Sequence, residues 1–472
     1  MIQLILFSTI FIALAILVVP QRLAPLLPWL ASLGHSLPYL GLGRITAQLE
    51  AGMTPSVFYS INLFESTLDF SFAFSREAGI LLLALLPFFI LISVGDGQAP
   101  EKTDTRNRRR RLVGTLLTHL GLIGLVTSTS VMALVITWPL FLLGNYLLVF
   151  WDQRLASKGG AGFRHAVFAA MLLSTLLLTW SLVTLASAAG TFDFAAIIPA
   201  AQESILPTTQ WWILLGVFLA VAVVLPTFPL HGWLSSSGKL SAVTAALLVG
   251  LVSKGALLIL ITAGLRLLPD AAPSFGFALV IVGLLTMAYG ALAAFGTTGS
   301  TSTAYHGMIY NGILLILAGF GTEASLLAFA FGLVLAPYLL YFRYLLADWA
   351  SAIDSDKARV DKPHWAVGLG FGIALVLVAF LPGSPGLPWL VLTLSALRIS
   401  WITAAGILVF AVCHAGHLIA NRATLEESIS ALISRRHYLA AVLAGLLILV
   451  GLFPGALTRW LLPVSKILSF IP

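Results

Sequence analysis

The feature that most constrains the fold is the recurrence of long apolar runs along the chain. A helix needs about 20 apolar residues to cross the hydrocarbon core of a bilayer. Hydrophobic residues make up 59% and charged residues 9% of the 472 residues, so a water-soluble fold would expose large apolar areas. Because backbone groups in lipid must be paired internally, these runs are expected to be helices. The predicted fold is therefore an all-α polytopic membrane protein.

The hydropathy pattern predicts about fourteen transmembrane helices. A shorter apolar stretch, 387–398, follows a segment rich in proline and glycine and is expected to form a broken or re-entrant half-helix. The first helix lacks a charged n-region and a small-residue cleavage site, so it is expected to be an uncleaved span. The lone Cys413 excludes a disulfide within the chain. The predicted helices are 2–18, 22–42, 79–95, 112–129, 131–150, 165–187, 209–229, 241–264, 275–296, 303–321, 324–346, 364–382, 400–420 and 438–458.

Lysine and arginine predict the orientation, because basic loops stay on the cytoplasmic side. The opposite loop 188–208 carries Asp193 and Glu203 and no basic residue, which fits this orientation. With the basic loops in the cytoplasm, both termini are expected outside the cytoplasm of an inner (plasma) membrane. The run around Arg106 to Arg111 is interpreted first as a topology signal, with contact to anionic lipid or a partner subunit as the alternative. Nucleic-acid binding is not expected of so short a loop. The basic residues on the cytoplasmic side are Lys102, Arg106, Arg108, Arg109, Arg110, Arg111, Arg154, Lys158, Arg164, Lys239, Lys357, Arg359, Lys362, Arg422, Arg435 and Arg436.

The stretch from Pro226 to Lys254 carries the strongest functional signal. Pro226 and Pro229 each remove a backbone donor, so the helix that begins near 209 is expected to break or end there. The next helix carries one charge, Lys254, near the middle of an apolar span. Such residues usually face a polar interior and mark ion or proton paths, although a structural lysine that pairs with a neighbour is the alternative. His231, at the broken end, is more typical of a helix-end or interfacial residue than of a proton carrier.

This stretch resembles the antiporter-like membrane subunits of respiratory complex I (NADH-quinone oxidoreductase), which also occur in membrane-bound hydrogenases and Mrp-type cation/proton antiporters. Phe228 to Leu234 reads FPLHGWL, and Leu247 to Lys254 is similar to the family phrase LLxGxLxK. Further similar segments follow the family order, namely Phe74–Glu77, Ala189–Phe194, Gly283–Leu292, Ala304–Gly312 and Gly451–Gly455.

The resemblance implies an architecture and a mode of action. It implies one membrane domain, 1–472, with two inverted five-helix repeats over 112–264 and 275–420, each with a broken helix at the membrane midplane. It also implies that buried lysines, a glutamate and often histidines carry protons through hydrated half-channels. Any redox cofactors would lie in other subunits, so no cofactor is expected in this chain.

Most of the ionisable residues that the resemblance would carry over are replaced in this sequence. The family glutamate falls on Pro139, so Lys254 is expected to lack its glutamate partner. The acidic segment after Trp233 becomes three serines. The other replaced positions are three lysines, which fall on Val224, Pro337 and Leu390, and a histidine, which falls on Tyr310.

The remaining polar residues are the candidates for proton handling. His414 and His417 lie three residues apart on one helix face, where structural hydrogen bonding is favoured over proton transfer. A metal would need further ligands, and no metal site is predicted. Residues such as Tyr305, Tyr310 and Asn311 can also simply satisfy backbone groups between helices. The full candidate set is Lys254, His231, Ser253, Tyr305, His306, Tyr310, Asn311, His414 and His417.

Three functions stay open at this point. The first is a proton- or cation-translocating subunit of a larger redox-driven or antiport complex, with a reduced set of groups. The second is a non-conducting structural subunit of such a complex, and the third is a membrane partner in inorganic-carbon uptake. All three predict other membrane subunits as partners in the lipid bilayer. Catalysis by the chain alone is not expected, because the sequence has no Rossmann glycine pattern, iron–sulfur cysteines or nucleophile constellation.

Overall fold

The computed structural model contains eight helices that are long and apolar enough to cross a membrane, or up to nine with one bent pair. These counts apply to the part of the chain that the structure describes, and they make the protein a multi-pass membrane protein. The total of about fourteen spans stays a prediction, because helices 364–382 and 400–420, with Cys413, His414 and His417, lie outside that part. The structure describes residues 2–41, 48, 56–63, 66–97, 105–156, 160–355, 386–397 and 438–468.

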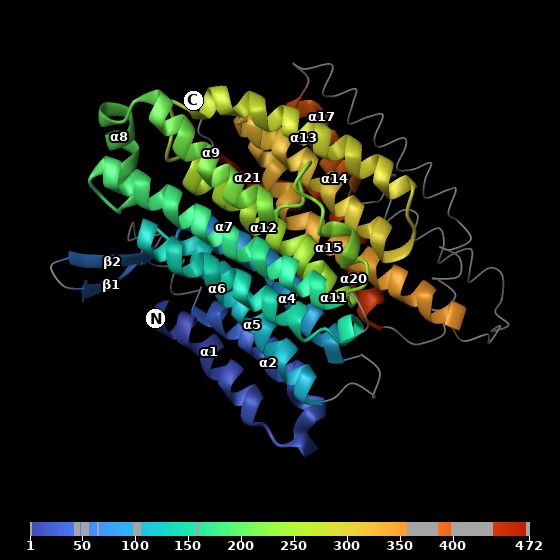
Figure 1. Cartoon of the computed structure of the whole chain (residues 1–472). Helices are drawn as coiled ribbons and strands as arrows, with labels where there is room; N and C mark the ends of the chain where they lie inside the picture. Colours follow the sequence, from blue (N-terminus) through green and yellow to red (C-terminus); the bar gives the residue numbers. More distant parts are fainter. Residues whose placement is uncertain are drawn as a thin grey trace. The chain divides into compact units, whose positions relative to one another are not determined.

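The chain divides into two compact units, and each is described by itself. Unit 1 comprises Met1–Leu225 and Val252–Phe275. Its helices α5 and α6 pack side by side (Figure 1). The elements of unit 1 are α1 (Ile2–Val18), η1 (Gln21–Leu26), α2 (Leu27–Ser36), η2 (Leu37–Gly41), β1 (Ser56–Leu63), β2 (Ser66–Ala73), α4 (Arg76–Gly97), α5 (Thr105–Thr127), α6 (Val131–Phe150), η3 (Gln153–Ala156), α7 (Gly160–Ala189), α8 (Phe194–Ser204), α9 (Pro207–Val224), α12 (Ser253–Ile259) and the π-helical η5 (Leu260–Leu265).

Several predicted helices of unit 1 keep their place but change their ends. Helix α6 has the predicted bounds, whereas α5 begins at Thr105, so the arginine run is helical rather than part of a loop. The predicted helix 22–42 is divided into η1, α2 and η2, which fits the prolines in this stretch, because proline removes a backbone donor and favours a short 3₁₀ turn or a helix start.

The antiparallel hairpin of β1 and β2 corrects the prediction of an all-α fold. In β2, Phe70 and Phe72 are buried and pack with Ala133 at the start of α6. Their spacing of two places both rings on one face of the strand. The alternation of buried and exposed residues is only one strand long and lies between apolar helices. Hydropathy averaged over the length of a helix therefore does not reveal it. Figure 1 shows the hairpin extending from the helices of unit 1.

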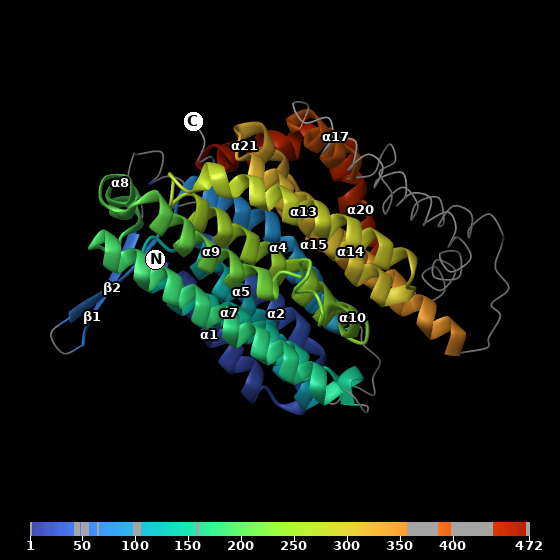
Figure 2. The same ribbon diagram turned by 45° about the horizontal axis from the view of Figure 1, so that its top comes forward.

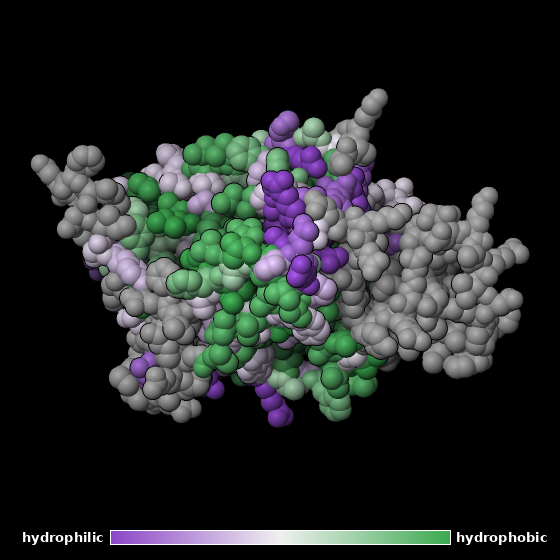
Figure 3. Space-filling model, turned by 90° about the horizontal axis from the view of Figure 1, so that it is seen from below, coloured by the Kyte–Doolittle hydropathy of each residue, from purple (hydrophilic) through white to green (hydrophobic). Residues whose placement is uncertain are grey.

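Unit 2 comprises Pro226–Leu251 and Gly276–Pro472. Figure 2 shows α14 and α15 running alongside each other, and these two helices are in extensive contact. Large hydrophobic areas lie on the face of the molecule in Figure 3, as expected for helices that contact lipid. The elements of unit 2 are α10 (Leu234–Ser237), α11 (Ala242–Ala245), the π-helical η4 (Ala246–Val252), α13 (Ala272–Phe295), α14 (Gly299–Phe320), α15 (Glu323–Ser355), α17 (Gly386–Ala396), α20 (Tyr438–Leu452) and α21 (Pro454–Leu468).

The predicted helix 438–458 is wrong as a single element. Helices α20 and α21 meet at an angle of 81°, with Pro454 as the first residue of α21. Proline is well tolerated at the first position of a helix but clashes inside one, so it favours a new helix over a continuous one. The predicted half-helix 387–398 corresponds to α17, whose flanking segments lie outside the described residues.

Glycines hold α13 and α14 together by close backbone contact. A Cβ atom on Gly276 would lie 2.4 Å from the carbonyl oxygen of Gly319, and one on Gly283 would lie 2.7 Å from that of Gly312. A Cβ on Gly312 would in turn lie 2.6 Å from the carbonyl oxygen of Gly283. Small residues at such contacts are the usual way for helices to associate in lipid, where hydrophobic burial supplies little driving force.

We expect Gly312→Val to destabilise the protein, because its side chain would push the backbones of α13 and α14 apart. Overpacking of this kind costs about 1–3 kcal/mol, which lowers Tm by about 3 °C or more in a thermal unfolding scan of the detergent-solubilised chain. Gly445→Val in α20 is the matched control, because a Cβ on Gly445 meets nothing within 4 Å. An equal loss of Tm in the two variants would contradict the proposed role of the glycine contact.

Candidate proton-handling site

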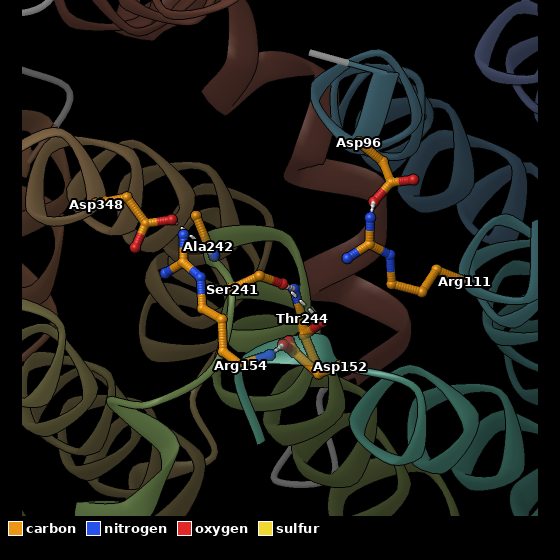
Figure 4. A network of polar contacts seen from close by, with 8 residues as sticks. All are labelled: Asp96, Arg111, Asp152, Arg154, Ser241, Ala242, Thr244 and Asp348. Atoms are coloured by element: carbon orange, nitrogen blue, oxygen red, sulfur yellow. Dashed lines mark hydrogen bonds and ion pairs between the residues drawn. The ribbon is translucent and has the colours of Figure 1, made fainter. Parts of the chain in front are cut away.

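The break between α9 and α11 lies where the prolines predicted it. Helix α9 ends at Val224, and α11 begins only at Ala242. Two backbone donors of this break are paired by side chains of neighbouring helices. The amide of Phe228 donates to Thr286 Oγ1 at 3.1 Å, and the amide of Ala242 donates to Asp348 Oδ2 at 3.2 Å (Figure 4). The predicted interruption is therefore confirmed.

Lys254 lies deep in the helix that follows the break, a span that runs from Ala242 to Leu265. Its side chain is 1% exposed, and Nζ donates a hydrogen bond to Ser253 Oγ at 3.1 Å. π-Helical turns precede and follow α12, and such turns are frequent at functional sites. A Cβ on Gly255 would lie 2.7 Å from the Phe141 ring, so glycine lets α6 approach beside the lysine. These contacts enclose Lys254 in protein rather than leaving it exposed to lipid.

A hydrogen-bonded set of uncharged side chains connects α6, α7 and α9. Trp138 Nε1 donates to Ser174 Oγ at 3.2 Å, and the Ser174 hydroxyl donates to the carbonyl oxygen of Ala220 at 2.6 Å. Trp138 is 1% exposed and directly precedes Pro139 in α6. The polar groups beside Pro139 are therefore neutral.

His231 is partly buried among aromatic rings in the break. Its ring centroid lies 4.1 Å from that of Tyr289 on α13 and 5.9 Å from that of Phe228. Burial lowers the pKa of His231, and a backbone hydrogen bond with Thr227 partly opposes this shift. Tyr289 lies 6.4 Å from Tyr305 between ring centroids, so it stands between two of the predicted residues. Tyr289 lies in the GLLTMAYGAL segment but is not among the candidate residues predicted from the sequence.

Helix α14 carries a buried row of polar side chains that includes His306, Tyr310 and Asn311. His306 Nδ1 is 2.8 Å from the carbonyl oxygen of Ser302, so Nδ1 carries the proton and Nε2 is the nitrogen that can accept one. Tyr310 forms a side-chain hydrogen bond with Arg343 of α15. Sequence reasoning missed Arg343, which is 6% exposed, although an arginine within a predicted apolar helix is the signal that could have identified it.

A second buried polar cluster, outside the predicted set, joins α2, η2, α4 and α5. His35 Nδ1 and His119 Nδ1 are 3.0 Å apart. On the other side of its ring, His119 Nε2 lies 2.9 Å from the hydroxyl of Tyr39. This hydroxyl donates a hydrogen bond to the carbonyl oxygen of Leu82 at 3.1 Å. Only one placement of protons satisfies all three contacts: His119 donates from Nε2 to Tyr39, and His35 donates from Nδ1 to His119. His35 Nε2 is then a buried acceptor with no partner among the residues that the structure describes.

The described residues contain no group of three or more His, Cys, Asp or Glu side chains that could hold a metal ion. Within unit 2, the structure brings His231, Tyr289 and Tyr305 into one aromatic group. It joins Tyr310 to Arg343 and Trp389. Lys254 and Ser253 belong to unit 1, and His414 and His417 lie outside the described residues.

The central part of the chain matches a known protein family. Residues 128–347 match the family described as "NADH:quinone oxidoreductase/Mrp antiporter, TM". The chain is similar to this family over that region. The matched segment contains the break, Lys254 and the polar row of α14, and the resemblance inferred from the sequence is confirmed.

Relatives of the antiporter family match at low identity but over long stretches. NADH-quinone oxidoreductase subunit M of Mycobacterium tuberculosis is 24% identical over 351 residues, which cover 70% of this chain and 64% of that protein. The fold is similar to a chain of respiratory complex I from Thermus thermophilus with bound NADH, with a TM-score of 0.78 at 19% identity over 99% of both chains. It is also similar to a chain of an archaeal membrane-bound sulfane sulfur reductase, with a TM-score of 0.82 at 15% identity over 99% of this chain and 96% of the other.

Pro337 and Leu390, on which the resemblance predicts two family lysines to fall, both lie in helices of unit 2. Pro337 lies inside the continuous helix α15, and a Cβ on Gly250 would lie 3.4 Å from its Cα. Leu390 lies in α17 next to Trp389, whose indole donates to the carbonyl oxygen of Ala328 at 3.1 Å. In unit 2 these positions therefore contribute packing and not charge.

We expect His119→Phe to lower the stability of the chain, because the Nδ1 proton of His35 loses its acceptor and the hydroxyl of Tyr39 loses one of its contacts. A buried group that loses its partner costs about 1–3 kcal/mol. Thermal unfolding measures the loss, and His165→Phe is the control, because His165 is exposed. A tolerated His119→Phe would argue against the hydrogen-bond chain.

The same cluster predicts opposite tautomers for its two histidines. ¹⁵N spectra of the histidine-labelled chain in nanodiscs should show His35 protonated at Nδ1 and His119 protonated at Nε2. Spectra of His35→Gln and His119→Gln assign the signals. Two rings protonated at Nε2 would contradict the proposed hydrogen bonds among His35, His119 and Tyr39.

Proposed function

We propose that the chain is a proton-translocating membrane subunit of a multisubunit complex of the complex I and Mrp type, and that Lys254 carries the proton. The observation that carries this proposal is the burial of one lysine, 1% exposed, within a membrane-length apolar helix that begins after a proline break. An ammonium group in such a span is costly and is usually retained for function. The family match over the region around Lys254 supports the same conclusion.

Neighbouring polar groups support transfer to and from a lysine. Ser253 Oγ accepts a hydrogen bond from Lys254 and, as a hydroxyl, can pass a proton on. His306 is suited to a relay because Ser302 fixes its Nδ1 proton and an imidazole Nε2 can take up and release a proton. Further candidates are Tyr305, Tyr310, Asn311 and His231, and His414 and His417 remain candidates from the sequence.

The setting of the subunit is part of the same proposal. We infer other membrane subunits as partners, because the antiporter family is known from assemblies and the fold matches chains of two membrane complexes. We also infer two inverted repeats, over 112–264 and 275–420, within one membrane domain, a location in the plasma membrane, and termini outside the cytoplasm. The last inference follows from the basic loops.

A second candidate function is a structural subunit that conducts nothing. It is favoured by the loss of ionisable side chains at Pro139, Val224, Pro337 and Leu390, the positions that the antiporter resemblance would fill with a glutamate and three lysines. A subunit of this kind would keep the fold and its contacts with other subunits. It would not depend on the charge of Lys254.

Lys254→Gln separates the two functions. If Lys254 carries the proton, the variant should lose about tenfold or more of the rate of proton uptake by proteoliposomes that contain the assembled complex, because a positioned proton-transfer group typically contributes at least this much. Uptake is followed with a pH-sensitive dye inside the vesicles. Lys239→Gln is the control, since Lys239 lies in the loop before α11 and outside the proposed path.

Assembly and Tm of each complex are measured in the same preparations. Unchanged uptake in a correctly assembled Lys254→Gln complex would assign the subunit a structural role. A loss of uptake that accompanies loss of assembly would be resolved by Lys254→Arg, which keeps the charge but releases its proton far less readily. An active Lys254→Arg complex would contradict transfer through Lys254.

A further inference from the structure

Two π-helical segments lie in the span that carries Lys254, one on each side of it. Segment η4 covers Ala246–Val252, η5 covers Leu260–Leu265, and the α-helical turns of α12 (Ser253–Ile259) lie between them. A π-helical hydrogen bond joins residues five apart, whereas an α-helical one joins residues four apart. Each π segment therefore contains a wide turn, with one residue more than an α-helix would place there.

Both ends of this span are held by side chains of neighbouring helices. Before η4, the amide of Ala242 donates to Asp348 Oδ2 at 3.2 Å, within unit 2. After η5, the amide of Asp270 donates to Gln210 Oε1 at 3.2 Å, and Gln210 Nε2 donates to Asp270 Oδ2 at 2.9 Å, within unit 1. A change in the middle of the span must therefore be accommodated by its wide turns.

Glycines lie at close contacts between this span and the helices around it. A Cβ atom on Gly255 in α12 would lie 2.7 Å from the nearest atom of α6. A Cβ on Gly264 in η5 would lie 3.1 Å from α9, and one on Gly250 in η4 would lie 3.4 Å from α15. Glycine has no side chain that must pass a neighbouring helix when the backbone turns. Rotation therefore meets less resistance at these three contacts than at interlocked side chains.

A wide turn can move along a helix while both ends of the helix stay in place. If the wide turn of η4 moves past α12 and joins that of η5, each residue that it passes takes the helical position next to its own. Such a residue turns by about 100° about the helix axis and shifts by about 1.5 Å along it. Lys254 and Ser253 would turn together, so the hydrogen bond of 3.1 Å from Nζ to Ser253 Oγ can be kept. The wide turns therefore offer Lys254 a second orientation within the same span.

We propose that η4 and η5 act as paired hinges, and that rotation of α12 moves Lys254 between a proton-accepting and a proton-releasing orientation. In one orientation the neutral amine of Lys254 takes up a proton delivered by water from one side of the membrane. In the other, the ammonium releases this proton to water that leads to the opposite side, and the neutral amine is restored. This inference rests on the proposed function, because the hinges have no such task if Lys254 carries no proton.

Rotation meets a requirement of a path with few ionisable groups. The resemblance predicts that a glutamate and three lysines of the family fall on residues without ionisable side chains. Lys254, which is 1% exposed, must then exchange protons with both sides of the membrane from one enclosed position. A second orientation of the same lysine replaces the transfer between several fixed groups.

Deletion of both Ala246 and Ala263 tests the hinges. It removes one residue from each π segment, so the whole span can form an α-helix with its ends and Lys254 in their present positions. The double deletion should lose about tenfold or more of the rate of proton uptake by proteoliposomes that contain the assembled complex. Ala246→Ser/Ala263→Ser is the matched control, because it changes the same two positions but keeps the chain length, and it should retain uptake. Assembly and Tm are measured for both variants.

Lys254→Gln in the same assay separates the hinges from the proposed function. Unchanged uptake in the Lys254→Gln complex would overturn both. Loss of uptake in Lys254→Gln together with full uptake in the double deletion would overturn the hinges alone. Equal losses in the double deletion and in its serine control would also count against the hinges, because the control keeps both wide turns.

If the double deletion does not assemble, hydrogen–deuterium exchange of the wild-type complex decides. The amides of α12 should exchange at least about tenfold faster than those in the equally buried middle of α14, because a moving wide turn breaks their hydrogen bonds. Equal protection of the two helices would overturn the proposal.

Discussion

An interrupted helix survives in a bilayer only if the protein pairs the backbone groups that the interruption releases. Between α9 and α11 this condition is met by side chains of α13 and α15, through Thr286 and Asp348. Because α11 starts at Ala242, Lys254 lies twelve residues further along the same membrane-length span, Ala242–Leu265. The break thus fixes the place of the lysine within its span, and it also places His231 beside Tyr289. The position of the candidate site depends on how this single stretch of backbone is paired.

Much of this arrangement could be predicted from the sequence, because it depends on local chemistry. The length of an apolar run predicted α6, and the missing donors of Pro226 and Pro229 predicted the break. What could not be predicted depends on contacts between distant segments. His35 and His119 are 84 residues apart, and each is an ordinary polar residue in its own helix. The hairpin of β1 and β2 was missed because its alternation is short, and its buried rings pack on Ala133 of a later helix.

The arginine run illustrates how a sequence feature can serve two purposes. As a loop it is interpreted first as a topology signal, but the structure extends α5 back to Thr105, so helical spacing separates the arginines into two faces. On one face Arg111 forms an ion pair with Asp96, and on the other Arg106, Arg109 and Arg110 line a cavity beside α1. A buried ion pair is weak evidence for stability, since desolvation offsets the attraction, but it fixes the rotation of α5 about its axis. That rotation determines which arginines remain accessible.

Pro139 and Pro337, on which the resemblance predicts ionisable family residues to fall, lie inside continuous helices, where proline has a further consequence. Each proline withholds the amide that would pair with the carbonyl four residues earlier, on Val135 and Leu333. Under the predicted correspondence, an ionisable side chain is exchanged for a backbone acceptor, which can hold water but cannot carry a net charge. Proton transfer through such a subunit would then rest on the few groups that change charge, above all Lys254 and His306. The loss of charge that the resemblance predicts at the prolines therefore does not by itself exclude conduction. It predicts that conduction is far more sensitive to these two residues than in a subunit with a full set of ionisable groups.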